Sequence, residues 1–227
     1  MKFFDSLIRE TEKTLAIFPK QEYSKRMPWA DAGQQQMILR RDTAFELEGV
    51  GFNLITSGQI SDGIVVVGDD LWNIHEKRPF ARITLVQVEE NGEAQDTYNL
   101  IKKIDYVKYH IFPDGYMMRS TSRSHQEVVR VSFNAIESSI NFQQIGSLMI
   151  EKYKQIPAVQ GVQVFFITDP KANYSKFEAI AKKSHEVTET LNHVMNKVVL
   201  DCNVCNLKSI CDEVEGMKEL HFGRLNT

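Results

Sequence analysis

The chain has 227 residues, of which 25% are charged and 42% hydrophobic, and its formal net charge is −3. This composition is typical of a globular protein with its own core, and the absence of a Lys/Arg-rich run excludes the electrostatic signature of a nucleic-acid-binding protein. No apolar run is long enough for a membrane-spanning helix, and the charged opening MKFFDSLIRE does not fit a signal peptide. We therefore expect a cytoplasmic protein.

The N-terminal region divides into a helix and a connector. Residues 2–18 place apolar side chains at helical spacing between charged ones, which predicts an amphipathic helix that docks on its own domain or on a partner, a second copy included. Residues 19–37 contain Pro19, Pro28 and Gly33 and show no sustained period, so they predict a connector. We expect three units: this region at 1–37, a main domain at 38–200 and a cysteine-containing segment at 201–227.

The main domain begins with β-rich runs separated by turn residues. These runs and the later ones predict strands at 45–47, 52–56, 64–67, 81–88, 116–119, 127–133 and 162–168. Residues 98–106 predict a helix or a helix–strand junction, and 141–155 predict a helix. The carboxylates of Asp69 and Asp70 are interpreted as caps rather than metal ligands. Interleaved strands and helices without a strict βαβ repeat predict a mixed α/β (α+β) fold, a mixed sheet with packed helices.

A long amphipathic helix is the clearest element of the sequence. Its apolar face is formed by residues that recur at spacings of three and four, namely Phe177, Ile180, Ser184, Val187, Leu191, Val194 and Val198. Ser175 and Glu178 have the spacing of a capping box directly after Asp169-Pro170. Core packing explains this face, so we expect the helix to position the segment that follows it.

All three cysteines of the chain follow that helix within ten residues, as Cys202, Cys205 and Cys211. A Cys-x2-Cys turn brings two thiolates to one metal, and a third thiolate shortly after completes a soft-ligand site for an iron–sulfur cluster or zinc. His221 is the nearest soft candidate for a fourth ligand, ahead of the harder Asp201, Asp212 and Glu213. The alternative, reduced cysteines at a helix end without a metal, remains open.

Three arginines, Arg119, Arg123 and Arg130, fall close together near a predicted hairpin. Guanidinium groups in this arrangement can clamp a phosphate, although a solvated face is the more common explanation. The sequence contains no P-loop, dinucleotide fingerprint, nucleophile elbow or HExxH motif.

The order of several short motifs resembles the β subunit of the carbon monoxide dehydrogenase/acetyl-CoA synthase complex, from about residue 38 to about residue 223. The motifs are Arg40-Arg41-Asp42-Thr43, Glu48-Gly49, Gly51-Phe52, the segment from Asp62 to Asp70, Val131-Ser132-Phe133, Ile145-Gly146, Tyr153-Lys154 and Cys202-x2-Cys205. The resemblance implies a mixed α/β domain that precedes a nickel centre joined to a 4Fe–4S cluster, where a methyl group carried by a corrinoid protein, CO and coenzyme A become acetyl-CoA. It implies that Cys202, Cys205 and Cys211 bind the cluster, that Cys205 bridges to nickel, and that Arg119 and Arg123 contact coenzyme A.

The chain also departs from the family pattern. The gap between its second and third cysteines is shorter, Leu220-His221-Phe222-Gly223 stands where the family has its fourth cluster cysteine, and the later Cys-Gly-Cys segment is absent. The family's coenzyme A tryptophan is also missing. We therefore expect a truncated relative that partners other subunits or a corrinoid protein and is not competent alone for acetyl-CoA synthesis. A non-catalytic, zinc-stabilised binding or assembly module with the same fold is the alternative.

Overall fold

The computed structural model describes residues 2–33, 40–89, 94–120, 125–195, 205, 207–214 and 217. The elements along the chain are α1 (Asp5–Leu15), β1 (Gln21–Tyr23), η1 (Arg40–Asp42), β2 (Thr43–Thr56), β3 (Gly63–Val67), η2 (Leu71–Asn73), β4 (Arg78–Val88), α2 (Ala94–Val107), η3 (Lys108–His110), β5 (Tyr116–Ser120), β6 (Gln126–Ser132), α3 (Phe133–Glu137), α4 (Phe142–Lys154), β7 (Val159–Ile167), α5 (Tyr174–Met195) and α6 (Lys208–Glu213). Within these described residues, no helix has both the length and the apolar composition needed to cross a membrane.

The strands form one seven-stranded sheet in the order β1-β3-β7-β4-β2-β6-β5. The pairs β3/β7 and β4/β2 are parallel, and all other neighbours are antiparallel. The predicted mixed α/β fold, with helices packed on a mixed sheet and a long helix near the C-terminus, is therefore confirmed.

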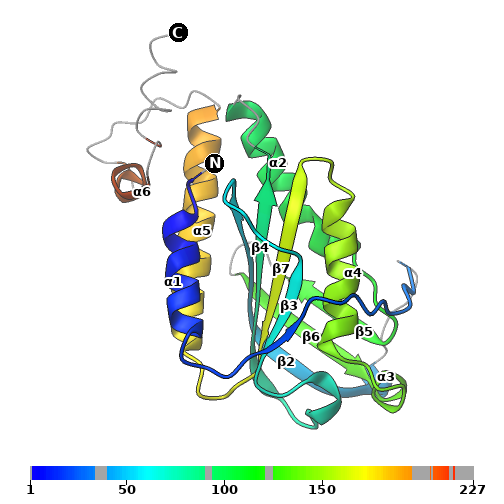
Figure 1. The fold of residues 1–227 in the computed structure, drawn as a ribbon. Helices are drawn as coiled ribbons and strands as arrows, with labels where there is room; N and C mark the ends of the chain where they lie inside the picture. Colours follow the sequence, from blue (N-terminus) through cyan, green and yellow to red (C-terminus); the bar gives the residue numbers. More distant parts are fainter. Residues whose placement is uncertain are drawn as a thin grey trace.

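Helices cover both faces of this sheet (Figure 1), with α1 and α5 on one side and α4 on the other. The amphipathic face of α1 buries Phe4, Leu7, Ile8 and Leu15, and the helix contacts β2 and α5. Of the two docking partners expected for the N-terminal helix, the structure thus shows its own domain. The predicted face of α5 is buried from Phe177 to Val194, while Val198 lies outside the described residues.

Strand β2 is one 14-residue strand and not the two short strands that were predicted. Glycines at 49 and 51 resemble a turn in the sequence, but in the structure they continue the strand. The strand β6 pairs with β2 only as far as Val50, whereas β4 pairs with it as far as Thr56. Helix α2 lies beside the remaining part of β2 and contacts both α5 and α4.

Side-chain caps set two element ends differently from the predictions. Phe133, predicted as the last residue of a strand, begins α3 because the Ser132 hydroxyl accepts a hydrogen bond from Ala135 N. Ser175 does not begin the long helix: α5 starts one residue earlier, and Asn173 Oδ1 accepts from Lys176 N at 3.1 Å. Asp70 is a cap, as predicted, since its Oδ1 accepts from Leu71 N and from Phe142 N, each at 2.7 Å.

Candidate functional site

Two of the cysteines predicted as ligands, Cys205 and Cys211, lie in the described segment that follows α5. Cys205 precedes α6 and Cys211 lies within it: Lys208 N donates to Cys205 O at 3.2 Å, and Cys211 N donates to Leu207 O at 3.3 Å. Both cysteines are half-buried. Cys202 and His221 lie outside the described residues, so the four predicted ligands cannot be placed together.

Helix α6 is held against the domain by apolar side chains and one ion pair. Ile210, Val214 and Met217 are buried in the main core, and Lys183 of α5 pairs with Glu213. Among the residues that the structure describes, no three His, Cys, Asp or Glu side chains gather as a metal site. The metal centre therefore stays a prediction.

Of the three arginines considered as a phosphate clamp, Arg119 and Arg123 are also the coenzyme A candidates. Arg119, in β5, lines a cavity of about 170 Å³ together with Lys108 and Tyr109. Arg123 lies outside the described residues. Arg130 donates to Glu46 across the sheet at 2.5 Å, so its guanidinium group already has a carboxylate partner.

A buried ionic network that the sequence did not reveal joins β4, β6 and β2. Arg82 of β4 and Glu127 of β6 are both 0% exposed, and Arg82 Nε and Nη2 each donate to the Glu127 carboxylate at 2.9 Å. Arg82 Nη1 also donates to Thr84 Oγ1 at 2.7 Å and to Asn53 Oδ1 at 3.2 Å. Burial alone would lower the pKa of Arg82, but the charge of Glu127 raises it, so the guanidinium stays protonated.

Gly51 provides the space that this ion pair occupies. A Cβ atom at this position would lie 1.8 Å from Glu127 Oε2 and 3.0 Å from Arg82 Nη2. Any side chain at Gly51 must therefore displace the carboxylate or the guanidinium. The glycine is required by close approach and not by backbone conformation.

Asn53 connects this network to two helices. Tyr153 of α4 donates to Asn53 Oδ1 at 2.9 Å, and Asn53 Nδ2 donates to Asp105 Oδ1 of α2 at 2.9 Å. Ser184 Oγ of α5 donates to the backbone oxygen of Asn53 at 3.4 Å. Side chains from three helices thus converge where β2 has passed the end of β6.

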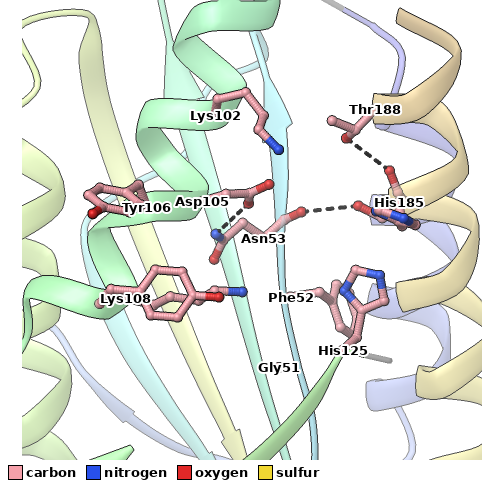
Figure 2. A pocket seen from close by; sticks show the side chains of 12 residues that line it. Gly51, Phe52, Asn53, Lys102, Asp105, Tyr106, Lys108, His125, His185 and Thr188 are labelled. Carbon is pink, nitrogen blue, oxygen red and sulfur yellow. Dashed lines mark hydrogen bonds between the residues drawn. The ribbon is translucent and has the colours of Figure 1, made fainter. Parts of the chain in front are cut away.

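A cavity of about 130 Å³ opens at this point, between α2 and α5. Figure 2 shows Lys102 and Asp105 of α2 on one side, His185 and Thr188 of α5 on the other, and Asn53 between them. A second cavity, of about 420 Å³, shares His125 and His185 with the first. Cavities in which a few polar groups converge on a partly apolar lining are the default candidates for ligand binding.

The electrostatic environment shifts the pKa values of three groups at this cavity. Burial lowers the pKa of Lys108, and the charge of Arg82 lowers it further. Burial raises the pKa of Asp105, although the hydrogen bond from Asn53 opposes the shift. Burial, His185 and Lys108 together lower the pKa of His125 to about 4. Shifts of this kind concentrate at functional sites.

His125 has an unusual backbone and an unusual side chain. Its φ of 51° lies in the left-handed region, and its backbone oxygen accepts from Gly51 N at 2.9 Å. Its Nε2 atom is buried and has no hydrogen-bond partner in the described part of the chain. The rings of His125 and His185 are 5.1 Å apart between centroids.

Sequence reasoning missed these residues because they come from separate elements. One signal was present: Arg82 is a single charge inside the apolar run 80–86, and such a charge is expected to be paired. Its partner could not be named because Glu127 lies 45 positions away.

Comparison with known proteins does not assign the chain. No family model matches it, and no curated protein sequence matches it either.

Proposed function

We propose that this protein is an acetyl-CoA-synthase-like subunit of a carbon monoxide dehydrogenase/acetyl-CoA synthase type system. In this proposal it binds an iron–sulfur centre, with nickel as a further candidate, through Cys202, Cys205 and Cys211. One observation supports it best: the short segment that carries Cys205 and Cys211 is anchored on the long helix by buried Ile210, Val214 and Met217. An anchored segment holds its ligands in place, as a metal centre requires.

The donor chemistry of this segment fits such a centre. Thiolates are the ligands that iron–sulfur clusters and zinc prefer, and Cys205 and Cys211 are half-buried rather than sealed in the core. His221 is the proposed fourth ligand. A bound cluster would supply electron transfer, and the chain would supply its position relative to a partner subunit or a corrinoid protein.

The proposal does not include acetyl-CoA synthesis by the chain alone. Only three cysteines are present in the sequence. If all three bind a cluster, no thiolate is left for the second nickel of the family, and histidine or backbone donors give a metal of different properties. Coenzyme A binding at Arg119 and Arg123 is a secondary part of the proposal.

Anaerobic metal analysis of the purified chain tests the proposal. We expect iron and acid-labile sulfide in the wild type, and loss of the centre in each of Cys202→Ser, Cys205→Ser and Cys211→Ser, because removing one of three thiolates weakens the whole site. Ser209→Ala, an exposed change within the same short helix, is the matched control and should retain the metal.

Two results would contradict the proposal in different ways. Full metal content in Cys211→Ser would rule out the three-thiolate site. Stoichiometric zinc without iron or sulfide would instead favour the alternative, a zinc-stabilised binding or assembly module that shares the fold.

A further inference from the structure

The cavity between α2 and α5 is built where two strands end at different points. Gly51 N donates to His125 O, which among the described residues is the last backbone hydrogen bond between β2 and the chain leading into β6. Beyond it, Asn53 O accepts from Ser184 of α5 instead of from a strand. The opening is thus a consequence of the sheet topology, and side chains from α2, η3 and α5 line it.

The charges around this cavity do not cancel. Arg82 and Glu127 neutralise each other beneath it, and Asp105 accepts from the Asn53 amide. Lys102 and Lys108 both line the cavity, and in the described part of the chain neither forms an ion pair. Figure 2 shows both side chains extending from the α2 side toward Asn53. Two amines thus face one carboxylate, and although burial lowers the pKa of Lys108, a bound anion would favour its charged form.

The neutral hydrogen-bonding groups add donors on the opposite wall. The rings of His125 and His185 lie together where the two cavities meet, and the buried Nε2 atom of His125 lacks a partner within the described residues. The hydroxyls of Ser184 and Thr188 already donate to backbone oxygens. The groups that remain for a ligand are therefore two amines, two imidazoles and the hydroxyls of Tyr106 and Tyr109 at the exposed side.

We propose that this cavity binds a small oxyanion, a carboxylate or phosphate group, between the amines of Lys102 and Lys108 and the imidazoles of His125 and His185. Lysine amines and imidazole N–H groups form charge-assisted hydrogen bonds with such oxygens. Half-buried Lys108 is the deeper of the two amines and exposed Lys102 stands at the rim. None of these residues belongs to the cysteine segment, so the inference is independent of the proposed metal centre.

Asp105 limits where the anion can lie. Its carboxylate lines the same cavity and repels a second negative charge, so the anion must lie on the histidine side of Lys108. The Asn53 amide donates a hydrogen bond to Asp105 Oδ1, and burial raises the pKa of the Asp105 carboxyl. The raised pKa reduces the repulsion, whereas the hydrogen bond from Asn53 favours the charged carboxylate and opposes that effect. We expect binding in the millimolar range, because Asp105 and, in the adjoining cavity, Glu178 and Glu186 oppose the two lysines.

Histidine side-chain NMR of the full chain is a direct test. Inorganic phosphate and sodium acetate are titrated separately at constant pH, with sodium chloride keeping the ionic strength fixed. We expect saturable shifts of the imidazole signals of His125 and His185 with at least one oxyanion, and none for His75, which is exposed and does not line the cavity. The two titrations distinguish a phosphate site from a carboxylate site.

Substitution of the lysines makes the test specific. Lys108→Gln should weaken binding at least about tenfold, the loss expected for one charge-assisted hydrogen bond. Lys103→Gln, an exposed neighbour on α2 that does not line the cavity, is the charge-matched control and should bind like the wild type. If circular dichroism shows that Lys108→Gln is unfolded, Lys102→Gln at the exposed rim takes its place, with the same direction of effect.

Three outcomes would overturn the inference. The first is the absence of a saturable shift with either anion. The second is an equal shift of all histidines, which would indicate a general ionic effect. The third is equal binding by the lysine variants and by Lys103→Gln, which would show that the amines of this cavity do not hold the anion.

Discussion

Two regions on the same face of the sheet are equally buried but are stabilised in opposite ways. Phe80 and Arg82 lie two residues apart in β4, so their side chains point to one face, and both are 0% exposed. Phe80 belongs to an aromatic cluster with Phe142 and Phe166. The ring centroids of Phe142 and Phe166 are 4.4 Å apart, and the ring of Phe80 stacks against both. Arg82 belongs to the ionic network with Glu127. Helix α4 contributes a side chain to each region: Phe142 stacks on Phe80, and Tyr153 donates to Asn53.

The two regions differ in how much stability is lost when one of their side chains is removed. Burial of apolar area is non-directional, so the aromatic cluster loses stability gradually when one ring is trimmed. A buried charge is stabilised only by its own partner, and removal of that partner leaves the full desolvation cost. The ionic network therefore depends more on each individual partner than the aromatic cluster does. It is also the one that adjoins the cavity, through Asn53.

The largest effect is expected when the buried ion pair is broken from one side. Glu127→Gln leaves the Arg82 cation buried without a counter-charge and should lower the free energy of unfolding by about 3–5 kcal/mol. Urea unfolding monitored by circular dichroism measures this loss. Replacing both partners, as Arg82→Met with Glu127→Leu, should restore most of the stability because no charge is then left in the core. A double variant as unstable as the single one would mean that shape rather than charge is decisive.

An intermediate effect is expected from Gly51→Ala. The added methyl group would lie 1.8 Å from Glu127 Oε2, so the ion pair must shift, at an expected cost of about 1–3 kcal/mol. Gly63→Ala is the matched control in another strand, because the nearest atom to its Cβ, Gln163 Nε2, is 3.8 Å away. Its stability should stay within about 0.5 kcal/mol of the wild type. Equal urea midpoints for the two variants would contradict the close approach at Gly51.

The fold was predictable wherever the evidence in the sequence is local. The buried face of α5 follows from its 3.6-residue period, and the apolar run at 162–167 identifies β7. The continuity of β2 was not predictable, because glycine in a strand reads as a break unless its close neighbours are known. These neighbours, Phe80 at Gly49 and Glu127 at Gly51, come from other strands. Tertiary contact thus overrode local propensity.

The two candidate sites differ in the same respect. The cysteines are neighbours in the sequence, so their spacing alone predicts a site, although Cys202 and His221 lie outside the described residues. The cavity residues come from β2, α2, η3, α5 and the chain before β6, and no short motif contains them. The charge balance of this cavity depends on which carboxylates already have a partner, and those partners are brought together only in the folded chain.

The smallest expected effect is a pH dependence of stability caused by His125, which lines the cavity beside the ionic network. Because burial, His185 and Lys108 lower the pKa of His125 to about 4, the folded chain releases this proton at pH values where the unfolded chain still holds it. Between an ordinary histidine pKa of about 6.5 and about 4, protons therefore favour the unfolded state. Stability should rise with pH across this window and level off above it. The effect is modest because solvent screens the part-exposed ring.

Urea midpoints at several pH values, for the wild type and His125→Asn, measure this contribution. Asparagine is chosen because it tolerates the left-handed backbone of His125. Asp105 acts in the opposite direction, since its raised pKa favours proton uptake by the folded chain and so adds stability as the pH falls. The contribution of Asp105 is present in both proteins, so the difference between their curves isolates the contribution of His125.

His125→Asn should show a shallower rise of stability with pH than the wild type, whereas His75→Asn, at an exposed position, should follow the wild type. Parallel curves for wild type and His125→Asn would mean that this imidazole titrates alike in the folded and unfolded chains, and that the cavity wall is more open to water than its buried Nε2 atom indicates.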